Sequence, residues 1–306
     1  MDIDKLKEAL ELHAAYLDDH TTGVKAHLSD ADLRGADLRD ADLRDADLRG
    51  ADLRSADLRS ANLRDANMSD ADMRSADLRD ANLRDADLCS ADLRDANLRG
   101  ADLCGADLCD ADLRGADLRS ANLRGADLRS ADLRDANLRD AKLRGAKLCD
   151  ANLRDANLRD ADLCSADLCG TDLCDADLCS ADLCGTDLCD AKLCGADLRS
   201  ADLRDANLCG TDLCDAKLCG ADLRRADLRD ANMSDATGQR LLPQRYDGHQ
   251  FFLVQKYDET WFIRAGCRAF TIPEYREHVK TYSDETKARE TTRILDFAQS
   301  ILDDKK

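Results

Sequence analysis

Cysteine is the residue type with the greatest chemical potential in this sequence, because 15 cysteines occur among 306 residues. Fourteen of them lie between Cys89 and Cys219 at separations that are all multiples of five, and the other is Cys267. Thiols can pair as disulfides, bind soft metals or act as nucleophiles. Such a count is typical of small secreted scaffolds, but the first residues lack the basic and apolar regions of a signal peptide. We therefore expect a cytoplasmic protein, in which the placement of the cysteines decides their chemistry.

Other catalytic residue types form no recognised active-site pattern. The sequence has no nucleophile elbow, phosphate-binding loop or His-Glu-x-x-His motif. Histidines recur every seven residues from His13 to His27, and two helical turns would hold the first pair too far apart for one metal. Cys267 could form a nucleophile pair with His249 or His278, but a buried and inert cysteine is the favoured alternative. We predict no enzyme activity, no cofactor and no metal site.

A five-residue repeat is the framework that must position these residues. From Ala26 to Asp235 the chain consists of 42 consecutive units. The first position is Ala or Thr, the second mostly Asp or Asn, the third Leu or Met, and the fourth Arg, Cys or Ser. A period of five fits neither a helix nor a long strand, because the apolar pair would change face at every unit. The pattern predicts short extended segments with the first and third residues inward, joined by corners and coiled into a solenoid.

The units Ala-(Asp/Asn)-Leu-x-x resemble those of the pentapeptide-repeat family over about two thirds of the chain. The resemblance implies a mainly β fold, a right-handed four-sided parallel β-helix with four units in each coil. Twenty residues per coil would arrange the 42 units in 10.5 coils. Stacking at ~4.8 Å would then give a rod roughly 50 Å long. A single coil buries too few leucines to offset the ordering of its backbone, so stability must come from stacking and both ends need a cover.

Residues 1–25 and 239–306 differ from the repeat in composition. The first segment predicts an amphipathic capping helix from Asp4 to roughly His20, lying over the first coil and followed by a linker. The last segment contains ten of the 11 aromatic residues and predicts a small α+β domain. Its expected elements are a hairpin over 251–264, a helix from Pro273 and a final helix after Ser283-Asp284.

This C-terminal segment has two alternative roles. Residues 265–271 resemble tails that follow such solenoids in phage and prophage proteins. The domain is expected either to cap the solenoid or to act as an oligomerisation module that joins two copies in a homodimer.

The repeat places 14 cysteines at its fourth position, which points outward from the solenoid. Cysteines 20 residues apart should therefore stack on one side of the rod. The longest such column contains Cys149, Cys169, Cys189 and Cys209. Stacked α-carbons fall within the disulfide range, but parallel neighbours point the same way and keep their β-carbons apart. We predict reduced thiols, no zinc because four sulfurs cannot converge, and at most incidental binding of two-coordinate thiophilic metals.

The net charge of the chain limits the kinds of partner that it can bind. The chain carries 64 acidic against 45 basic residues, a net charge of −19, which disfavours direct contact with nucleic acid or an anionic membrane. Second-position Asp and fourth-position Arg predict a surface of ion pairs, each contributing ~0–1 kcal/mol. In residues 161–220, called the acidic band below, cysteine replaces arginine in ten of 12 units, and the band carries −9 of the repeat's −17. Over three coils this approaches the linear charge density of DNA.

Two functions fit these features. The first is a non-catalytic scaffold or binding rod with a protein partner that the sequence does not identify. The second follows from the resemblance, because some pentapeptide-repeat proteins are DNA mimics that bind DNA gyrase. The residues expected to carry such mimicry in the acidic band are Asp172, Asp175, Asp187, Asp190, Asp212 and Asp215. The segment 184–199 recurs at 209–224, a shift of five units that moves the copy to the neighbouring side. This repetition argues against a single face of the rod that is adapted to one partner.

Overall fold

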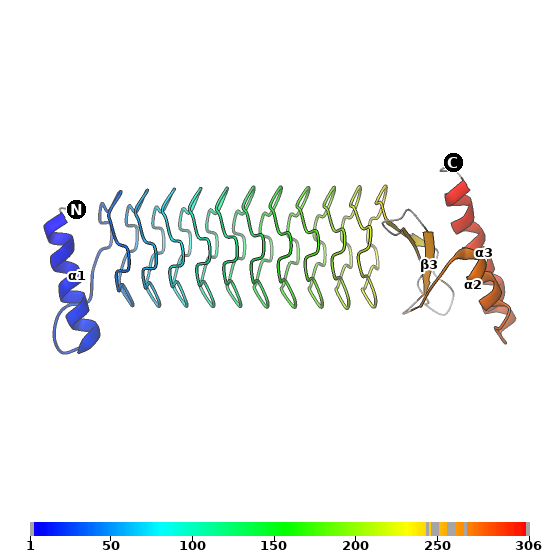
Figure 1. The fold of residues 1–306 in the computed structure, drawn as a ribbon, viewed down its shortest axis with the longest axis horizontal. Coiled ribbons are helices and arrows are strands. Elements are labelled where there is room, and N and C mark those ends of the chain that lie inside the picture. Colours follow the sequence, from blue (N-terminus) through cyan, green and yellow to red (C-terminus); the bar gives the residue numbers. More distant parts are fainter. Residues whose placement is uncertain (1–2, 243–244, 246–250, 256–260, 266–267, 304–306) are drawn as a thin grey trace.

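The computed structural model describes residues 3–242, 245, 251–255, 261–265 and 268–303. The repeat forms a rod, with helix α1 (Ile3–Asp18) at one end and a small α+β domain at the other (Figure 1). That domain contains strands β1 (Gln239–Leu242), β2 (Phe251–Gln255), β3 (Trp261–Ala265) and β4 (Arg268–Phe270), then helices α2 (Ile272–Val279) and α3 (Glu285–Asp303). None of the helices in the described residues has the length and apolarity that a membrane span requires.

Successive coils of the rod pair in parallel. The second residue of each unit bridges the residue 20 positions further on, from His27 with Asp47 to Lys217 with Thr237. The predicted spacing of 20 residues per coil is therefore confirmed. Residues 20 apart form a line along the rod, which we call a column.

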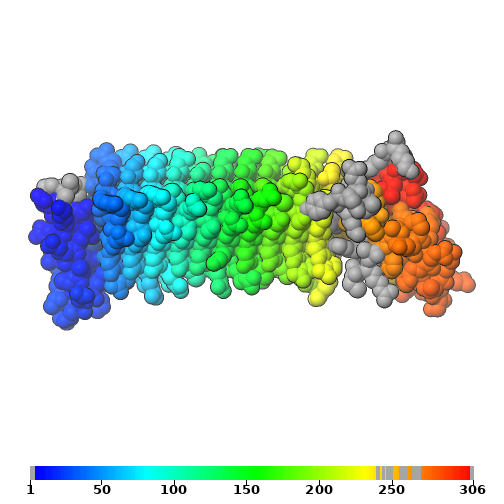
Figure 2. Space-filling model, in the orientation of Figure 1, coloured from blue at the N-terminus to red at the C-terminus, as the bar shows by residue number. Residues whose placement is uncertain are grey.

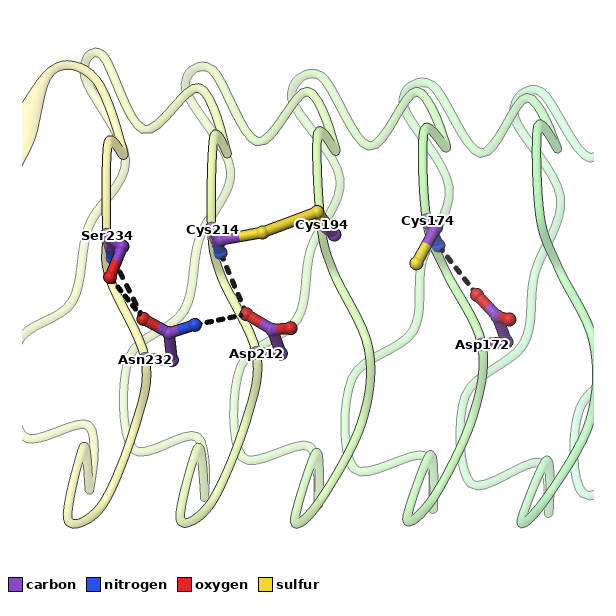
Figure 3. Close-up of a disulfide and its surroundings, with 7 residues drawn as sticks. All are labelled: Asp172, Cys174, Cys194, Asp212, Cys214, Asn232 and Ser234. Atoms are coloured by element: carbon purple, nitrogen blue, oxygen red, sulfur yellow. Dashed lines mark hydrogen bonds between the residues drawn. A yellow bond between two sulfur atoms is a disulfide. The ribbon is translucent and has the colours of Figure 1, made fainter.

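The backbone N–H groups of a unit are all satisfied, as the unit 91–95 illustrates. Its second N–H donates to the preceding coil, its third and fifth donate to the following coil, and its first closes a corner, at N···O distances of 2.7–3.0 Å. The fourth N–H, of Arg94, donates to the side-chain Oδ1 of Asp92 at 3.2 Å. Figure 3 shows the same bond from Cys174 to Asp172. The second position is Asp or Asn because either side chain supplies this acceptor.

Each corner depends on a left-handed residue at the fifth position. Every fifth residue from Asp30 to Asp235 has a positive φ, and 12 of these 42 residues are glycine. Positive φ at the third residue of a four-residue turn is the signature of a type II turn. The predicted corners are confirmed, and Asp and Ser tolerate a conformation that costs a non-glycine residue ~1–2 kcal/mol.

The first and third positions form the interior of the rod. Most of these alanines and leucines are 0–2% exposed. The three threonines of the first position, Thr171, Thr186 and Thr211, are equally buried, and their hydroxyls donate to leucine carbonyls at 2.7–2.9 Å. The predicted inward placement of these residues is confirmed.

Helix α1 lies against the first coil, close to the predicted range. Leu6 is buried with the core of the rod, and Ala9 and Leu10 pack against that core. His13 is completely buried, and its Nδ1 accepts a hydrogen bond from the N–H of Ala26 at 3.1 Å. The imidazole must therefore be neutral, because a proton on Nδ1 would remove this bond.

Mild acid is expected to release helix α1 before it affects the rod. Burial lowers the pKa of His13 below 6.5 and Lys25 acts in the same direction, whereas the backbone of Arg44 and the carboxylates of Asp42 and Asp45 act against this shift. Since the folded state holds the neutral form, its stability is complete above pH 6.5 and falls as pH drops toward the lowered pKa. Hydrogen-exchange protection factors of residues 3–18 should therefore fall between pH 7 and 5. His13→Gln should remove this pH dependence, whereas His20→Gln should retain it; equal behaviour would contradict the prediction.

The C-terminal sheet has the order β1-β2-β3-β4 with antiparallel neighbours. The predicted hairpin is confirmed by the β2–β3 register, and both predicted helices are present. Thr271 caps α2 in a capping box, and the carboxylate of Asp284 accepts N–H groups at the start of α3. Strands β1 and β4 were not predicted from the sequence.

Strand β2 joins the two parts of the molecule. Phe251 and Leu253 lie in the core formed with α2 and α3, whereas Phe252 and Val254 belong to the core of the rod. The alternation of side chains along a strand produces this division. The sheet thus lies between the last coil and the two helices (Figure 1), and the space-filling view shows one elongated body with the C-terminal domain directly beyond the rod (Figure 2).

Candidate partner-binding surface

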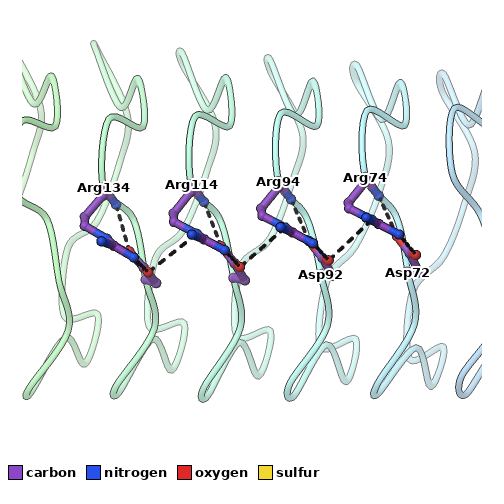
Figure 4. A network of polar contacts seen from close by, with 8 residues as sticks. Asp72, Arg74, Asp92, Arg94, Arg114 and Arg134 are labelled. Carbon is purple, nitrogen blue, oxygen red and sulfur yellow. Dashed lines mark hydrogen bonds and ion pairs between the residues drawn. The ribbon is translucent and has the colours of Figure 1, made fainter.

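The outer surface of the rod is built from the second, fourth and fifth positions, and arginine occupies much of the fourth. One column of fourth-position residues, the arginine column, contains Arg34, Arg54, Arg74, Arg94, Arg114 and Arg134. Each guanidinium lies over the Asp two residues before it. Figure 4 shows four of these arginines in successive coils.

Arg74 illustrates the geometry of this column. Its Nε and Nη2 donate to the two carboxylate oxygens of Asp72 at 2.8 and 2.6 Å. The same Nε lies 3.4 Å from Oδ2 of Asp92 in the next coil. Bidentate pairs within coils and weaker pairs between coils therefore alternate along the rod, which confirms the predicted ion-paired surface. The hydrogen bond from Arg74 also holds the pKa of Asp72 below its ordinary value.

Where cysteine replaces arginine, the second-position carboxylate keeps its backbone partner and loses the arginine of its own unit. Asp172, Asp187 and Asp212 accept the N–H of the cysteine two residues later at 3.0–3.1 Å. Of the 13 carboxylates in the acidic band, four form an ion pair with a described residue: Asp162, Asp197, Asp202 and Asp205. The negative charge of the band thus arises from nine carboxylates that have no such pair among the described residues.

All six sequence-predicted binding residues belong to these nine, but the structure does not gather them on one face. Second-position Asp172 and Asp212 share a column in which exposed Lys192 lies between them. Asp187 lies in a neighbouring column. The corner residues Asp175, Asp190 and Asp215 are exposed. The band therefore presents two adjacent acidic faces.

The cysteine column of Cys149, Cys169, Cys189 and Cys209 follows the register of the coils. Their units bridge in the order Lys147, Asp167, Asp187 and Asn207. The structure has all four as thiols of intermediate exposure; that they are free in solution stays a prediction. Two other repeat cysteines, Cys174 and Cys179, are buried at 7% and 8% exposed, so the fourth position is less outward than expected.

The prediction that every repeat cysteine is reduced is wrong at one pair. A disulfide joins Cys194 to Cys214 one coil away (Figure 3). Their Cα atoms are 4.7 Å apart, within the disulfide range. The prediction treated the separation of parallel β-carbons as prohibitive, but Figure 3 shows the two side chains turned toward one another along the column.

The structure gives little support to the other reactive groups considered above, the nucleophile pair and a metal site. Cys267 and His249, proposed above as a nucleophile pair, lie outside the described residues. His278 stacks on Phe270 with ring centroids 5.2 Å apart and has an aromatic role. The ligand atoms of Cys194, Cys214 and Asp215 lie within 4.8 Å of one another, but the disulfide already occupies both sulfurs.

Comparison with known proteins explains the regularity of the rod. The sequence profile of pentapeptide repeats matches in eight copies that together span residues 26–235. The chain belongs to the pentapeptide-repeat family. Members of this family fold as right-handed β-helices, so the right-handed β-helix predicted for the repeat is confirmed. The family match ends at Asp235 and does not extend into the C-terminal domain.

Solved pentapeptide-repeat structures include similar proteins. HetL from the cyanobacterium Nostoc sp. strain PCC 7120, involved in heterocyst differentiation regulation, is 40% identical with a TM-score of 0.51, and the match covers 67% of this chain and 91% of HetL. QnrB1, a plasmid-mediated fluoroquinolone resistance protein, is 18% identical with a TM-score of 0.40, covering 61% of this chain and 86% of QnrB1. The comparison with curated proteins gives no match.

Proposed function

We propose that this pentapeptide-repeat protein is a non-catalytic rod that binds a protein partner through the acidic band. In this proposal residues 1–25 and 239–306 close the ends of a solenoid of about ten coils over 26–235. The observation that carries the proposal is the set of nine uncompensated carboxylates on a surface where aspartates elsewhere pair with arginine. A concentration of uncompensated charge favours a partner with a basic surface.

The backbone supports binding because it holds these carboxylates in place. Each second-position Asp of the band is fixed by the N–H of the following fourth residue, as Asp187 is by Cys189 at 3.0 Å. Asp187 also accepts the side-chain amide of Asn207 in the next coil at 2.9 Å. A surface ordered before binding loses less conformational entropy on association than a mobile one.

DNA mimicry is the second candidate, with gyrase or another DNA-binding protein as the partner. Its support is the charge density, because the band carries −9 over three coils and B-DNA carries about eight charges over the same ~14 Å. The interruption by Lys192 and the division over two faces favour the general binding rod instead.

Affinity capture from the native host at low salt would supply the partner for a direct test. Binding should be compared between the wild type, a variant with the six predicted aspartates changed to Asn, and a control with six exposed corner aspartates outside the band changed to Asn. The control residues are Asp40, Asp70, Asp95, Asp110, Asp135 and Asp235.

We expect the band variant to lose at least tenfold in affinity and the control to retain it, with binding that weakens steeply as salt is added. Displacement of the partner by excess duplex DNA would support mimicry, and binding that persists in its presence would support the general rod. Equal affinity of all three proteins would show that the band is not the binding surface.

A further inference from the structure

The cysteine column is the longest uninterrupted line of thiols in the repeat, with Cys149, Cys169, Cys189 and Cys209 in four successive coils. Its register is fixed by the backbone at the cysteines themselves. The carbonyls of Cys169, Cys189 and Cys209 accept the N–H of the fifth residue one coil earlier at 3.0, 2.9 and 2.9 Å. The backbones of these cysteines are therefore held at the repeat distance of the rod, and rotation of the side chains sets the separation of the sulfurs.

That distance matches a particular coordination geometry. Cα atoms one coil apart lie 4.7 Å from each other at Cys194 and Cys214, and in-register side chains of parallel strands project the same way. Zinc–thiolate bonds are about 2.3 Å long, and with bonds of similar length an ion midway between two stacked sulfurs needs them about 4.6 Å apart. A third sulfur lies a further coil away, which excludes a tetrahedral zinc site made of sulfurs alone.

Carboxylates lie close to this column and raise the pKa of Cys149 and Cys189 within it. The Cys189 thiol donates to Oδ2 of Asp190 at 3.4 Å, and this bond with burial raises the pKa of Cys189 to about 11. Burial and then Asp167 raise the pKa of Cys149 to about 12. Cys149 and Cys189 are therefore poor nucleophiles at neutral pH. The same carboxylates that favour the proton would favour a cation that replaces it.

We propose that the cysteine column binds soft monovalent d10 cations of the Cu(I) or Ag(I) class, each held linearly between two stacked sulfurs. Soft thiolate ligands select such ions over hard ones. Four thiols can hold three ions when the two inner sulfurs each bridge two ions. Four S–H bonds break, six sulfur–metal bonds form and four protons pass to solvent, with no change in oxidation state.

Charge favours this bridged arrangement. Three monovalent ions that replace four protons change the net charge of the column by −1, whereas two separate two-sulfur sites would change it by −2. Three of the four cysteines lie in the acidic band, which already carries −9, so the smaller increase in negative charge is favoured. The neighbouring column of Cys174, Cys194 and Cys214 does not offer the same chain, because the disulfide occupies two of its sulfurs.

Silver(I) titration with native mass spectrometry tests the proposal on the full-length protein. Three double variants each remove two thiols from the repeat. Cys169→Ser/Cys189→Ser removes the inner pair, and Cys149→Ser/Cys209→Ser removes the outer pair. Cys104→Ser/Cys179→Ser removes two cysteines that have arginine one coil away on both sides.

Relative to the wild type, we expect the inner variant to bind three fewer ions, the outer variant two fewer, and the Cys104/Cys179 variant the same number. X-ray absorption should find two sulfur neighbours for each silver. Equal losses in the three variants, or three or more sulfurs around each ion, would overturn the proposal. Far-UV circular dichroism of each variant before silver is added verifies that the rod is folded, so that a loss of ions reports the missing thiols.

Discussion

Leu133→Ala is expected to lower the free energy of unfolding by about 2–5 kcal/mol, the usual cost of a cavity left by a buried leucine. Leu133 is completely buried near the middle of the rod. Each coil contacts only its two neighbours, so the surrounding coils cannot be stabilised by a distant core. Urea unfolding followed by circular dichroism measures the loss.

Arg134→Ala is the matched control for this prediction, since it lies in the same unit. Arg134 forms a bidentate pair with Asp132, but its side chain is 42% exposed. An exposed pair contributes ~0–1 kcal/mol, so the control should unfold close to the wild type. Hydrogen exchange should also show that Leu133→Ala weakens protection mainly in the coils on either side. Equal destabilisation by the two substitutions would mean that the surface network, and not the interior, holds the rod together.

Gly238→Ala is expected to separate the C-terminal domain from the last coil. Gly238 has a φ of +81°, and a β-carbon there would overlap the backbone nitrogen of Cys219 and lie 2.5 Å from its Cα. Backbone atoms cannot move aside as a flexible side chain can. The cost should therefore exceed the ~1–2 kcal/mol of a left-handed conformation alone, and the contacts of Phe252 and Val254 with the rod should weaken.

The single tryptophan provides the measurement for this second prediction. Trp261 lies in β3 of the C-terminal domain, so its fluorescence follows that domain while circular dichroism follows the whole chain. Gly125→Ala is the control, because Gly125 has a φ of +65° and open space where a β-carbon would be. We expect Gly238→Ala to lower the fluorescence melting temperature by several degrees more than Gly125→Ala. The same shift for both variants would show that the left-handed φ alone, and not the overlap with Cys219, lowers the melting temperature.

The architecture of the rod was predictable because each position of the unit has one environment that recurs. Alanine and leucine two residues apart identified the interior, and Gly, Ser and Asp identified the corner. The role of the second position was missed, although its signal was present: Asp and Asn interchange there in 37 of 42 units. Charge is not common to these two residues, whereas a side-chain oxygen is, and the structure shows this oxygen accepting the fourth N–H.

The candidate site was predictable in its charge and not in its arrangement. Counting charges along the chain located the acidic band, but neighbours in sequence face different sides of the rod, so the six aspartates divide between two faces. The Cys194–Cys214 disulfide was missed because side-chain rotation decides whether two stacked thiols meet. Strands β1 and β4 have only four and three residues, too few for a clear pattern, and their pairing with β2 and β3 is what orders them.

The number of units determines the angle between the two ends of the molecule as well as its length. Since four units complete one coil, adding four would lengthen the rod by ~4.8 Å and leave the C-terminal domain facing the same direction. Adding a single unit would turn that domain by a quarter of a revolution relative to helix α1. Adding units to such a protein therefore changes the relative orientation of its two ends. A partner that contacts both ends would distinguish insertions of one unit from insertions of four.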